Sequence, residues 1–396
     1  MSSTEHPAPN GAHRSRWRPL TDALMGFLFT PGTVTQGAPH VRDAISVQRM
    51  MVVVVFALVP ATVMAVYNTG LQANLALQDL GRAAADGWRG ELLASLGLGI
   101  APDSLVDNFM HGALYFLPVY AITLVAGGAW EILFAVIRRH AISEGFLVTS
   151  LLFALTLPPQ IPWWQVAIGI SFGVVIGKEI FGGVGMNVLN PALTGRCFLF
   201  FAYPRDISGD TVWVAVDGYT RATPLAELAD PDLSLSVSWL DAFYGLIPGS
   251  MGETSTLACL IGAAILLITR VASWRVMLGV TLGMAGLAGF FNVVGSDSNP
   301  MFQVTPVWHL VLGGFALGTV FMATDPVSAA HTRPGQFVYG VLIGVATVLV
   351  RVINPAFPEG IMLAILFGNV FAPAIDRIFV HRNIRRRRRR QSDDGW

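Results

Sequence analysis

The sequence predicts an all-α integral membrane protein with about ten transmembrane helices in two inverted five-helix repeats. The prediction rests on the composition, on ten apolar segments and on the distribution of arginine. Of 396 residues, 53% are hydrophobic and 13% are charged, whereas soluble proteins carry about 25% charged residues. This composition excludes a soluble enzyme of ordinary size and leaves no soluble domain to hold a nucleotide.

Ten apolar segments are candidates for membrane spans, because crossing a bilayer takes ~20 mostly apolar residues. They are 50–68, 112–137, 145–158, 165–182, 191–204, 254–269, 275–294, 307–323, 336–353 and 360–379. Several are short or interrupted by glycine or proline. The region before the first candidate is polar, which argues against a cleavable signal peptide.

The arginines predict the orientation, since basic residues gather on the cytoplasmic side of membrane proteins. With both termini cytoplasmic and an even number of spans, one side receives Arg14, Arg16, Arg18, Arg42, Arg49, Arg138, Arg139, Arg270, Arg275, Arg333, Arg382 and Arg385 to Arg390. The other side receives 69–111, 159–164, 205–253, 295–306 and 354–359, which are poorer in basic residues. We therefore expect a multi-pass protein of the bacterial inner membrane.

Two short elements recur in the same order in both halves and suggest an internal repeat. EGF at 144–146 and NPA at 190–192 correspond to GGF at 313–315 and NPA at 354–356. Because each half has an odd number of spans, the second copy would be inverted. Inverted repeats of broken helices place a polar site near the bilayer midplane. The alternative is chance, because Asn-Pro is a common start of a helix.

These segments divide the chain into five parts. They are a cytoplasmic N-terminal segment (1–48), a first five-span repeat (49–204), an outer loop (205–253), a second five-span repeat (254–381) and a basic cytoplasmic tail (382–396). Within the first part, 17–35 is expected to form an amphipathic helix on the membrane surface. The basic tail is typical of a topology signal that meets anionic lipid, and no nucleic acid is expected as a partner.

A polar stretch at 211–226, TVWVAVDGYTRATPLA, interrupts the apolar sequence. The Asp, Gly, Thr and Pro within 217–225 are typical of a turn, and residue chemistry alone predicts only a loop. Cys197 and Cys259 lie in apolar runs without CxxC spacing, so we expect buried thiols and no metal site.

Long runs of the chain resemble the B subunit of the sodium-translocating NADH:quinone oxidoreductases. They include EGFLVTSLLFAL, GISFGVVIGKEIFGG, LNPALTGR, ISGDTVWVAVDGY, HLVLGGFALGTVFMATDPVSA and INPAFPEGIMLAILF, and the similarity extends from Phe27 to Asn383. The D subunit of the Rnf electron-transport complex shares the flavin-attachment pattern. The N-terminal run TPGTVTQGAPHVRD fits the quinone reductase better.

The resemblance implies that FMN is esterified through its phosphate to the hydroxyl of Thr223, within a motif that includes Asp217 and Ala222. Such a bond would hold the flavin against diffusion, while the redox chemistry remains that of the cofactor. The family motif usually has glycine where this chain has Arg221. Whether Arg221 affects flavin attachment stays open.

The resemblance also implies a non-covalent riboflavin in the membrane part and ubiquinone as substrate. Asn190 and Arg196 are candidate riboflavin contacts. A local alternative is that Asn190 caps a helix beginning at Pro191. The N-terminal segment and the neighbourhood of Glu144 would line the quinone site, although a simple surface anchor explains the segment equally well.

Charged residues inside spans are functional candidates, because a charge at the bilayer centre costs at least ~2.5 kcal/mol. The resemblance implies that Glu144, Asp325 and Asp376 serve the sodium pathway, with backbone carbonyls of broken helices as further ligands. Asp376 could instead form a surface ion pair with the following arginines. Lys178, the only lysine of the chain, would pair with Glu179. Sodium and proton stay open as the coupling ion.

The implied function is that of one subunit in a six-subunit redox-driven sodium pump. Because the chain has no dinucleotide-binding fingerprint, NADH would be oxidised in a partner flavoprotein. The other implied partners are a second flavinylated subunit and a flavin transferase. No acid–base or nucleophilic catalytic residue is expected. Two alternatives stay open, an Rnf-type subunit acting between ferredoxin and NAD, and a stand-alone channel or transporter built from inverted repeats.

Overall fold

The computed structural model describes residues 47–138, 145–208, 211–230, 235–354 and 359–393. All regular elements in these ranges are helices, which confirms the all-α prediction. Six are long and apolar enough to cross a membrane: Arg49–Asp79, Leu105–Arg138, Trp163–Phe181, Trp274–Val294, Arg333–Ile353 and Ile361–Arg390. Three more are apolar but shorter: Gly145–Leu155, Pro191–Ala202 and Thr256–Ile268. The count of ten spans stays a prediction.

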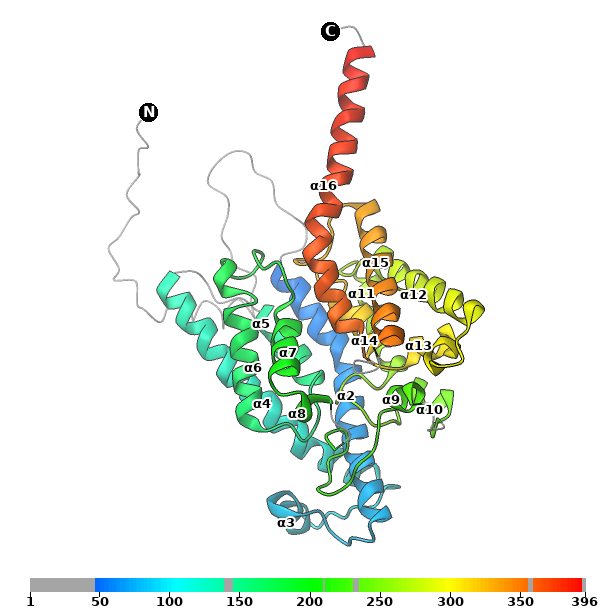
Figure 1. Ribbon diagram of the computed structural model, residues 1–396. Helices are drawn as coiled ribbons and strands as arrows, with labels where there is room; N and C mark the ends of the chain where they lie inside the picture. The colour runs from blue at the N-terminus through cyan, green and yellow to red at the C-terminus, as the bar shows by residue number, and fades with distance from the viewer. Residues whose placement is uncertain (1–46, 139–144, 209–210, 231–234, 355–358, 394–396) are drawn as a thin grey trace, which may run out of the picture.

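The first half contains five apolar helices, drawn in blue to green in Figure 1. They are α2 (Val47–Asp79), α4 (Leu105–Arg138), α5 (Gly145–Leu155), α6 (Trp163–Val175) and α7 (Pro191–Ala202). Helix α4 packs against α2, α5 and α6, and α7 packs against α5 and α6. Local sequence defines the start of α7. The Asn190 side chain caps the helix by accepting hydrogen bonds from the amides of Ala192 and Leu193, and Pro191 fits the first turn.

The second half lies beside the first and is drawn in yellow to red (Figure 1). It comprises α11 (Thr256–Ile268), α12 (Trp274–Val294), α13 (Pro306–Val311), α14 (Phe315–Leu317), the π-helical η3 (Gly318–Met322), α15 (Arg333–Ile353) and α16 (Ile361–Asp393). Helix α15 packs between α12 and α16, and η3 contacts α11, α12 and α16. Helices α2 and α11 join the two halves.

Short helices lie between these long ones. They are α3 (Gly87–Ser95), η1 (Glu179–Phe181), α8 (Pro204–Ser208), α9 (Pro224–Ala229), α10 (Trp239–Tyr244) and η2 (Pro300–Gln303). Helix α3 and the end of α16 lie at opposite ends of the molecule (Figure 1).

Helices α2 and α4 extend further into 69–111 than the sequence predicted. The apolar segments stop at polar side chains that the fold buries and pairs with one another. Asn74 Nδ2 donates to Asn108 Oδ1 at 2.8 Å, and His111 Nδ1 lies 2.7 Å from Asn74 Oδ1. Because these partners come from the facing helix, the amide groups of Asn74 and Asn108 and Nδ1 of His111 are paired when they are buried, and the helices continue.

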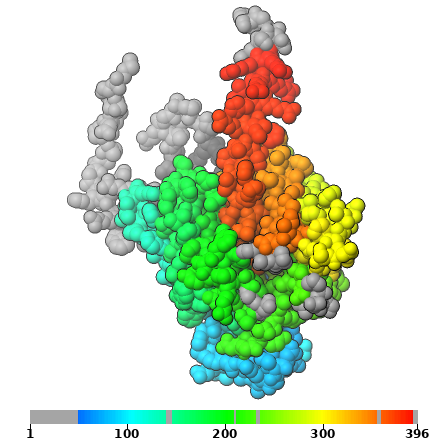
Figure 2. Space-filling view, viewed as in Figure 1, coloured from blue at the N-terminus to red at the C-terminus, as the bar shows by residue number. Residues whose placement is uncertain are grey.

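The candidate span at 307–323 is not one helix. Gly313 and Gly314 adopt positive φ angles of 62° and 66°, and this ends α13 before α14 begins. The segment beyond 382, predicted as a basic cytoplasmic tail, continues α16 as far as Asp393. It stands clear of the body of the molecule (Figure 2). The amphipathic helix expected at 17–35 lies outside the described residues.

Candidate functional site

Thr223 is the N-cap residue of α9 and is partly exposed. Its side-chain oxygen accepts a hydrogen bond from the amide of Ala226 at 3.3 Å, and Pro224 occupies the first helical position. Thr223 and Ala222 are partly exposed, and Asp217 is exposed. The structure therefore places the three motif residues where a modifying enzyme and a phosphate could reach them.

The chain before Thr223 is fixed to the first half. Residues 212–216 are buried, and Val214 to Val216 pack against Ala73, Ala76 and Leu77 of α2. Their carbonyls are also paired, because Tyr115 donates to Ala215 O and Gln160 donates to Val214 O, each at 2.9 Å. The sequence analysis did not predict this buried anchor, although the run VWVAV was its signal.

The chain after Thr223 is fixed to the second half. Pro224 and Leu225 are buried, and Leu225 packs on Gly313 at the break between α13 and α14. The Glu227 carboxylate accepts from the amide and the hydroxyl of Ser236 at 2.9 and 2.8 Å. Thr223 is thus held between two anchors, one on each half of the molecule.

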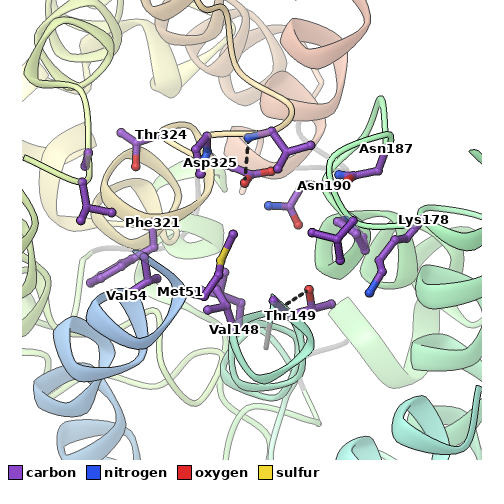
Figure 3. Close-up of a pocket in the computed structure, with 18 of the residues that line it drawn as sticks. Met51, Val54, Val148, Thr149, Lys178, Asn187, Asn190, Phe321, Thr324 and Asp325 are labelled. Carbon is purple, nitrogen blue, oxygen red and sulfur yellow. Dashed lines mark hydrogen bonds between the residues drawn. The ribbon is translucent and has the colours of Figure 1, made fainter. Parts of the chain in front are cut away.

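A cavity of about 60 Å³, lined mostly by apolar side chains with a few polar ones, lies between the two halves. Its walls come from α2, α5, the turn between α6 and α7, α11, and the chain that follows η3. Figure 3 shows the side chains of Thr149, Asn190, Thr324 and Asp325 around it. A cavity needs about 10–15 Å³ to hold one water, so this one has room for a few waters or a small cation with its ligands.

Asp325 is the carboxylate of this cavity. Its oxygens accept from the Val327 amide at 3.3 Å and from the Ser328 hydroxyl at 2.6 Å, which fixes the side chain in the turn after η3. Hydroxyl, amide and carboxylate oxygens are hard ligands and suit hard cations. The arrangement can bind a cation, and within the described residues no cluster of His, Cys, Asp and Glu indicates a transition-metal site.

Lys178 also lines the cavity and has a partner that the sequence did not predict. Its ammonium forms a buried ion pair with Glu131 of α4, and its expected partner Glu179 lies further away, at 3.7 Å. The Arg138 guanidinium lies 3.6 Å from the Glu179 carboxylate. Lys178, Glu131 and Glu179 are buried beside the cavity, and the exposed Arg138 lies at the edge of this cluster, so that every positive charge has a negative neighbour.

The remaining candidates for the ion pathway lie elsewhere. The Asp376 carboxylate accepts from the amides of His331 and Thr332 at 2.7 and 2.9 Å and from the Thr332 hydroxyl. It therefore stabilises the N-terminus of α15, and it is not among the described residues that line the cavity. Glu144 lies outside the described residues, directly before Gly145, which does line the cavity.

The candidate riboflavin contacts are engaged within the protein. Asn190 caps α7, as the local alternative held. Arg196 is buried and donates to Ser250 Oγ at 3.2 Å and to Glu359 Oε2 at 2.8 Å. The cavity beside Asn190 is far below the 300–1,000 Å³ typical of sites for organic ligands. Both residues therefore have partners within the protein, and their role as riboflavin contacts stays a prediction.

Arg196 belongs to a second charged cluster that joins the two halves near Thr223. Glu359, which pairs with Arg196, also accepts through its backbone carbonyl from Arg351 Nε at 3.2 Å. The carboxyl of Glu253 lies beside Gly314. Burial raises the pKa of Glu253 to about 8, although the nearby guanidinium of Arg196 opposes the shift.

Comparison with known proteins places these features in a family. Residues 34–385 match the NQR2, RnfD, RnfE family. The chain is 58% identical over 385 residues to the B subunit of the Na(+)-translocating NADH-quinone reductase of Chromohalobacter salexigens, covering 96% of this chain and 93% of that one. It is 56% identical over 393 residues to the protein of the same name from Ectopseudomonas mendocina, covering 98% and 97%.

Proposed function

The chain belongs to the NQR2, RnfD, RnfE family, and on that premise we propose that it is the flavin-carrying membrane subunit of a sodium-translocating NADH:quinone reductase. In this role it relays electrons from NADH, oxidised in a partner subunit, to ubiquinone and couples the transfer to sodium export. The relatives carry the name of the quinone reductase, which favours this function over an Rnf-type subunit. The partners would be the other subunits of the complex, including a second flavinylated one.

The proposal assigns covalent FMN to Thr223. The observation that carries it is a partly exposed threonine hydroxyl, at the start of α9, in a loop that is anchored on both sides. The flavin transferase would recognise the exposed Asp217 and the partly exposed Ala222. When bound, the flavin supplies the one-electron chemistry, and this chain holds its attachment point at a fixed place.

The proposal assigns the cation to the cavity of Asp325. The cavity offers one carboxylate with hydroxyl and amide groups, between the two halves of the chain. Such a position agrees with sites that lie between the repeats of transporters. Glu144 and Asp376 are proposed as further carboxylates of the pathway, and Asp376 would act from the N-terminus of α15.

Part of the helix packing agrees with two corresponding halves, and the inversion of the second half is proposed from the odd number of spans in each. In the first half, α6 packs between α4 and α7, and α5 contacts α2 and α7. In the second half, α15 packs between α12 and α16, while α14 and η3 take the place of α5 and contact α11 and α16. We therefore propose five corresponding spans in each half, in a bacterial inner membrane with both termini in the cytoplasm.

Replacing the attachment residue tests the flavin assignment. The full complex is expressed with the flavin transferase, denatured and separated on a gel, and the flavin fluorescence of this subunit is recorded under ultraviolet light. We expect a fluorescent band in the wild type and in Thr220→Ala, which changes an exposed threonine three residues away. We expect no fluorescence in Thr223→Ala, because no hydroxyl remains there to carry the phosphoester.

Each result bears on a different alternative. A dark wild-type band would contradict the flavin assignment and favour a stand-alone transporter. A fluorescent band in Thr223→Ala would move the attachment to another residue, which the mass of the peptide containing Thr223 would reveal. Quinone reduction by the purified complex separates this function from that of an Rnf-type complex.

A further inference from the structure

Arg351, on α15, is a fully buried arginine that binds the break between α13 and α14. Its Nη2 donates to the carbonyls of Leu312 and Gly313 at 2.7 and 3.1 Å, and its Nη1 donates to the carbonyl of His309 at 3.0 Å. The guanidinium also lies over the ring of Phe315, 5.8 Å from its centre. One side chain thus contacts both sides of the break.

The physical reason for this position lies in the end of α13. The last carbonyls of a helix have no partners within it and carry partial negative charge, which favours a cation there. In transporters, carbonyls of unwound helices ligate the transported cation. Here the guanidinium of Arg351 already donates hydrogen bonds to these carbonyls, so the break is not a second cation site.

Helix α9, which begins after Thr223, contacts the break between α13 and α14. A Cβ added at Gly313 would lie 2.6 Å from Leu225 Cδ2 and 2.8 Å from Arg351 Nη2. Leu225 of α9, Gly313 at the break and Arg351 of α15 therefore touch at one point. Leu225 follows Thr223, the N-cap of α9, by two residues, so the backbone of the first turn of α9 links the two positions.

The cavity of Asp325 lies at the other end of the chain segment that begins at this break. From Gly314 the chain passes through α14 and η3 and ends at Thr324 and Asp325, which line the cavity (Figure 3). The residues from Phe315 to Met322 are buried or partly buried. π-Helical turns occur frequently at functional sites, because they interrupt the regular register of the helix.

We propose that the segment 312–325 transmits movement between the loop that carries Thr223 (211–226) and the cavity of Asp325. Arg351 is the positioning residue that binds the end of this segment at Leu312 and Gly313. The inference rests on the proposed function, which supplies the flavin at Thr223 and the cation at Asp325. Loss of the contact at Gly313 is expected to uncouple the two processes while each site stays intact.

The test compares two substitutions of glycines that both have positive φ angles, so that each strains the backbone. Gly313 and Gly295 have φ angles of 62° and 66°, but only at Gly313 would a new methyl group meet other atoms. Gly313→Ala and Gly295→Ala are prepared in the full complex, and three quantities are measured in vesicles. They are flavin fluorescence of the subunit, quinone reduction by NADH, and uptake of ²²Na⁺ per electron.

We expect Gly313→Ala to keep its flavin and its quinone reduction and to lose at least about fivefold in sodium transported per electron, within the usual range of coupling between sites. Gly295→Ala should keep the wild-type ratio. Gly313→Ala crowds the contact with Leu225, whereas Leu225→Ala removes it from the side of α9. Leu225→Ala should lower the ratio as well, which covers the case that Gly313→Ala does not assemble.

An unchanged ratio in Gly313→Ala or in Leu225→Ala, with normal flavin fluorescence, would overturn the inference and leave the proposed function standing. Equal losses in Gly313→Ala and Gly295→Ala would also overturn it, because backbone strain alone would then explain the effect. A wild-type complex without flavin on this subunit would overturn both.

Discussion

Individual buried charges in this protein are neutralised by partners from other helices. Lys178 pairs with Glu131, Arg196 pairs with Glu359, and Arg351 binds backbone carbonyls. Burying an unpaired charge costs several kcal/mol of free energy, so the fold can bury each of these charges only together with its partner. Glu253 differs, because burial outweighs its positive neighbours and raises its pKa to about 8.

Glu253 should therefore make stability depend on pH. Its pKa in the folded chain, about 8, lies above the ordinary value of 4.5. A carboxyl with a raised pKa contributes stability that is fully present below about pH 4.5 and is lost as the pH rises towards about 8. We expect the midpoint of thermal unfolding of the complex to fall across this window, and to fall less in Glu253→Gln.

Tryptophan fluorescence of the purified complex, heated at several pH values, measures this difference. Glu91→Gln, which changes an exposed glutamate of α3, is the control and should follow the wild type. Parallel curves for the wild type and Glu253→Gln would show that this carboxyl does not titrate differently in the two states.

Among the elements, the contact between α12 and α15 depends most on small residues. A Cβ at Gly279 or Gly283 would meet the backbone of α15, and one at Gly340 or Gly344 would meet the backbone of α12. Close approach through small residues is a common way to join helices in membranes, where apolar side chains gain little by leaving lipid. This pair also holds Arg351 in place, since Arg351 lies near the end of α15.

Gly283→Ala is therefore expected to destabilise the protein by about 1–3 kcal/mol, as overpacking does. Its new methyl group would meet the carbonyl oxygen of Val341. Gly286→Ala, on the same helix, has nothing within 4 Å of the new Cβ. It should be neutral or stabilise the helix by up to about 1 kcal/mol. Unfolding in a titration with SDS measures both, and equal destabilisation would contradict the close contact.

At the scale of the whole molecule, the loop that carries Thr223 (211–226) and the basic end of α16 lie on opposite sides of the helical body (Figure 1). The arginines of 385–390 are exposed and continue the last candidate span. The cavity of Asp325 lies between the halves. In the proposed orientation, Thr223 and the basic end of α16 would lie on opposite faces of the membrane.

Cysteine labelling tests this orientation. In a background of Cys197→Ala and Cys259→Ala, single cysteines replace Ser298 in the loop after α12 and Arg386 in the basic helix, both exposed positions. We expect a membrane-impermeant maleimide to label Ser298→Cys in intact spheroplasts, and Arg386→Cys only after the membrane is opened. Labelling in the reverse pattern would place Thr223 in the cytoplasm and contradict the proposed function.

The sequence alone determined the features that depend on local chemistry. Composition set the membrane class, and Asn190 with Pro191 set the start of α7. Gly313 and Gly314 were identified as a recurring element, and they end α13. Long runs along the chain indicated the family. The cap and the glycine turn each follow from one short stretch of chain, because they need no distant partner.

Only the tertiary structure decided which distant residues meet. Polar residues such as Asn74 and His111 ended the apolar windows, yet they are buried in helices because their partners lie on the facing helix. The pairing of Lys178 with Glu131 and the contact of Leu225 with Gly313 join segments far apart in sequence. Such contacts depend on how the helices pack, which no local pattern specifies.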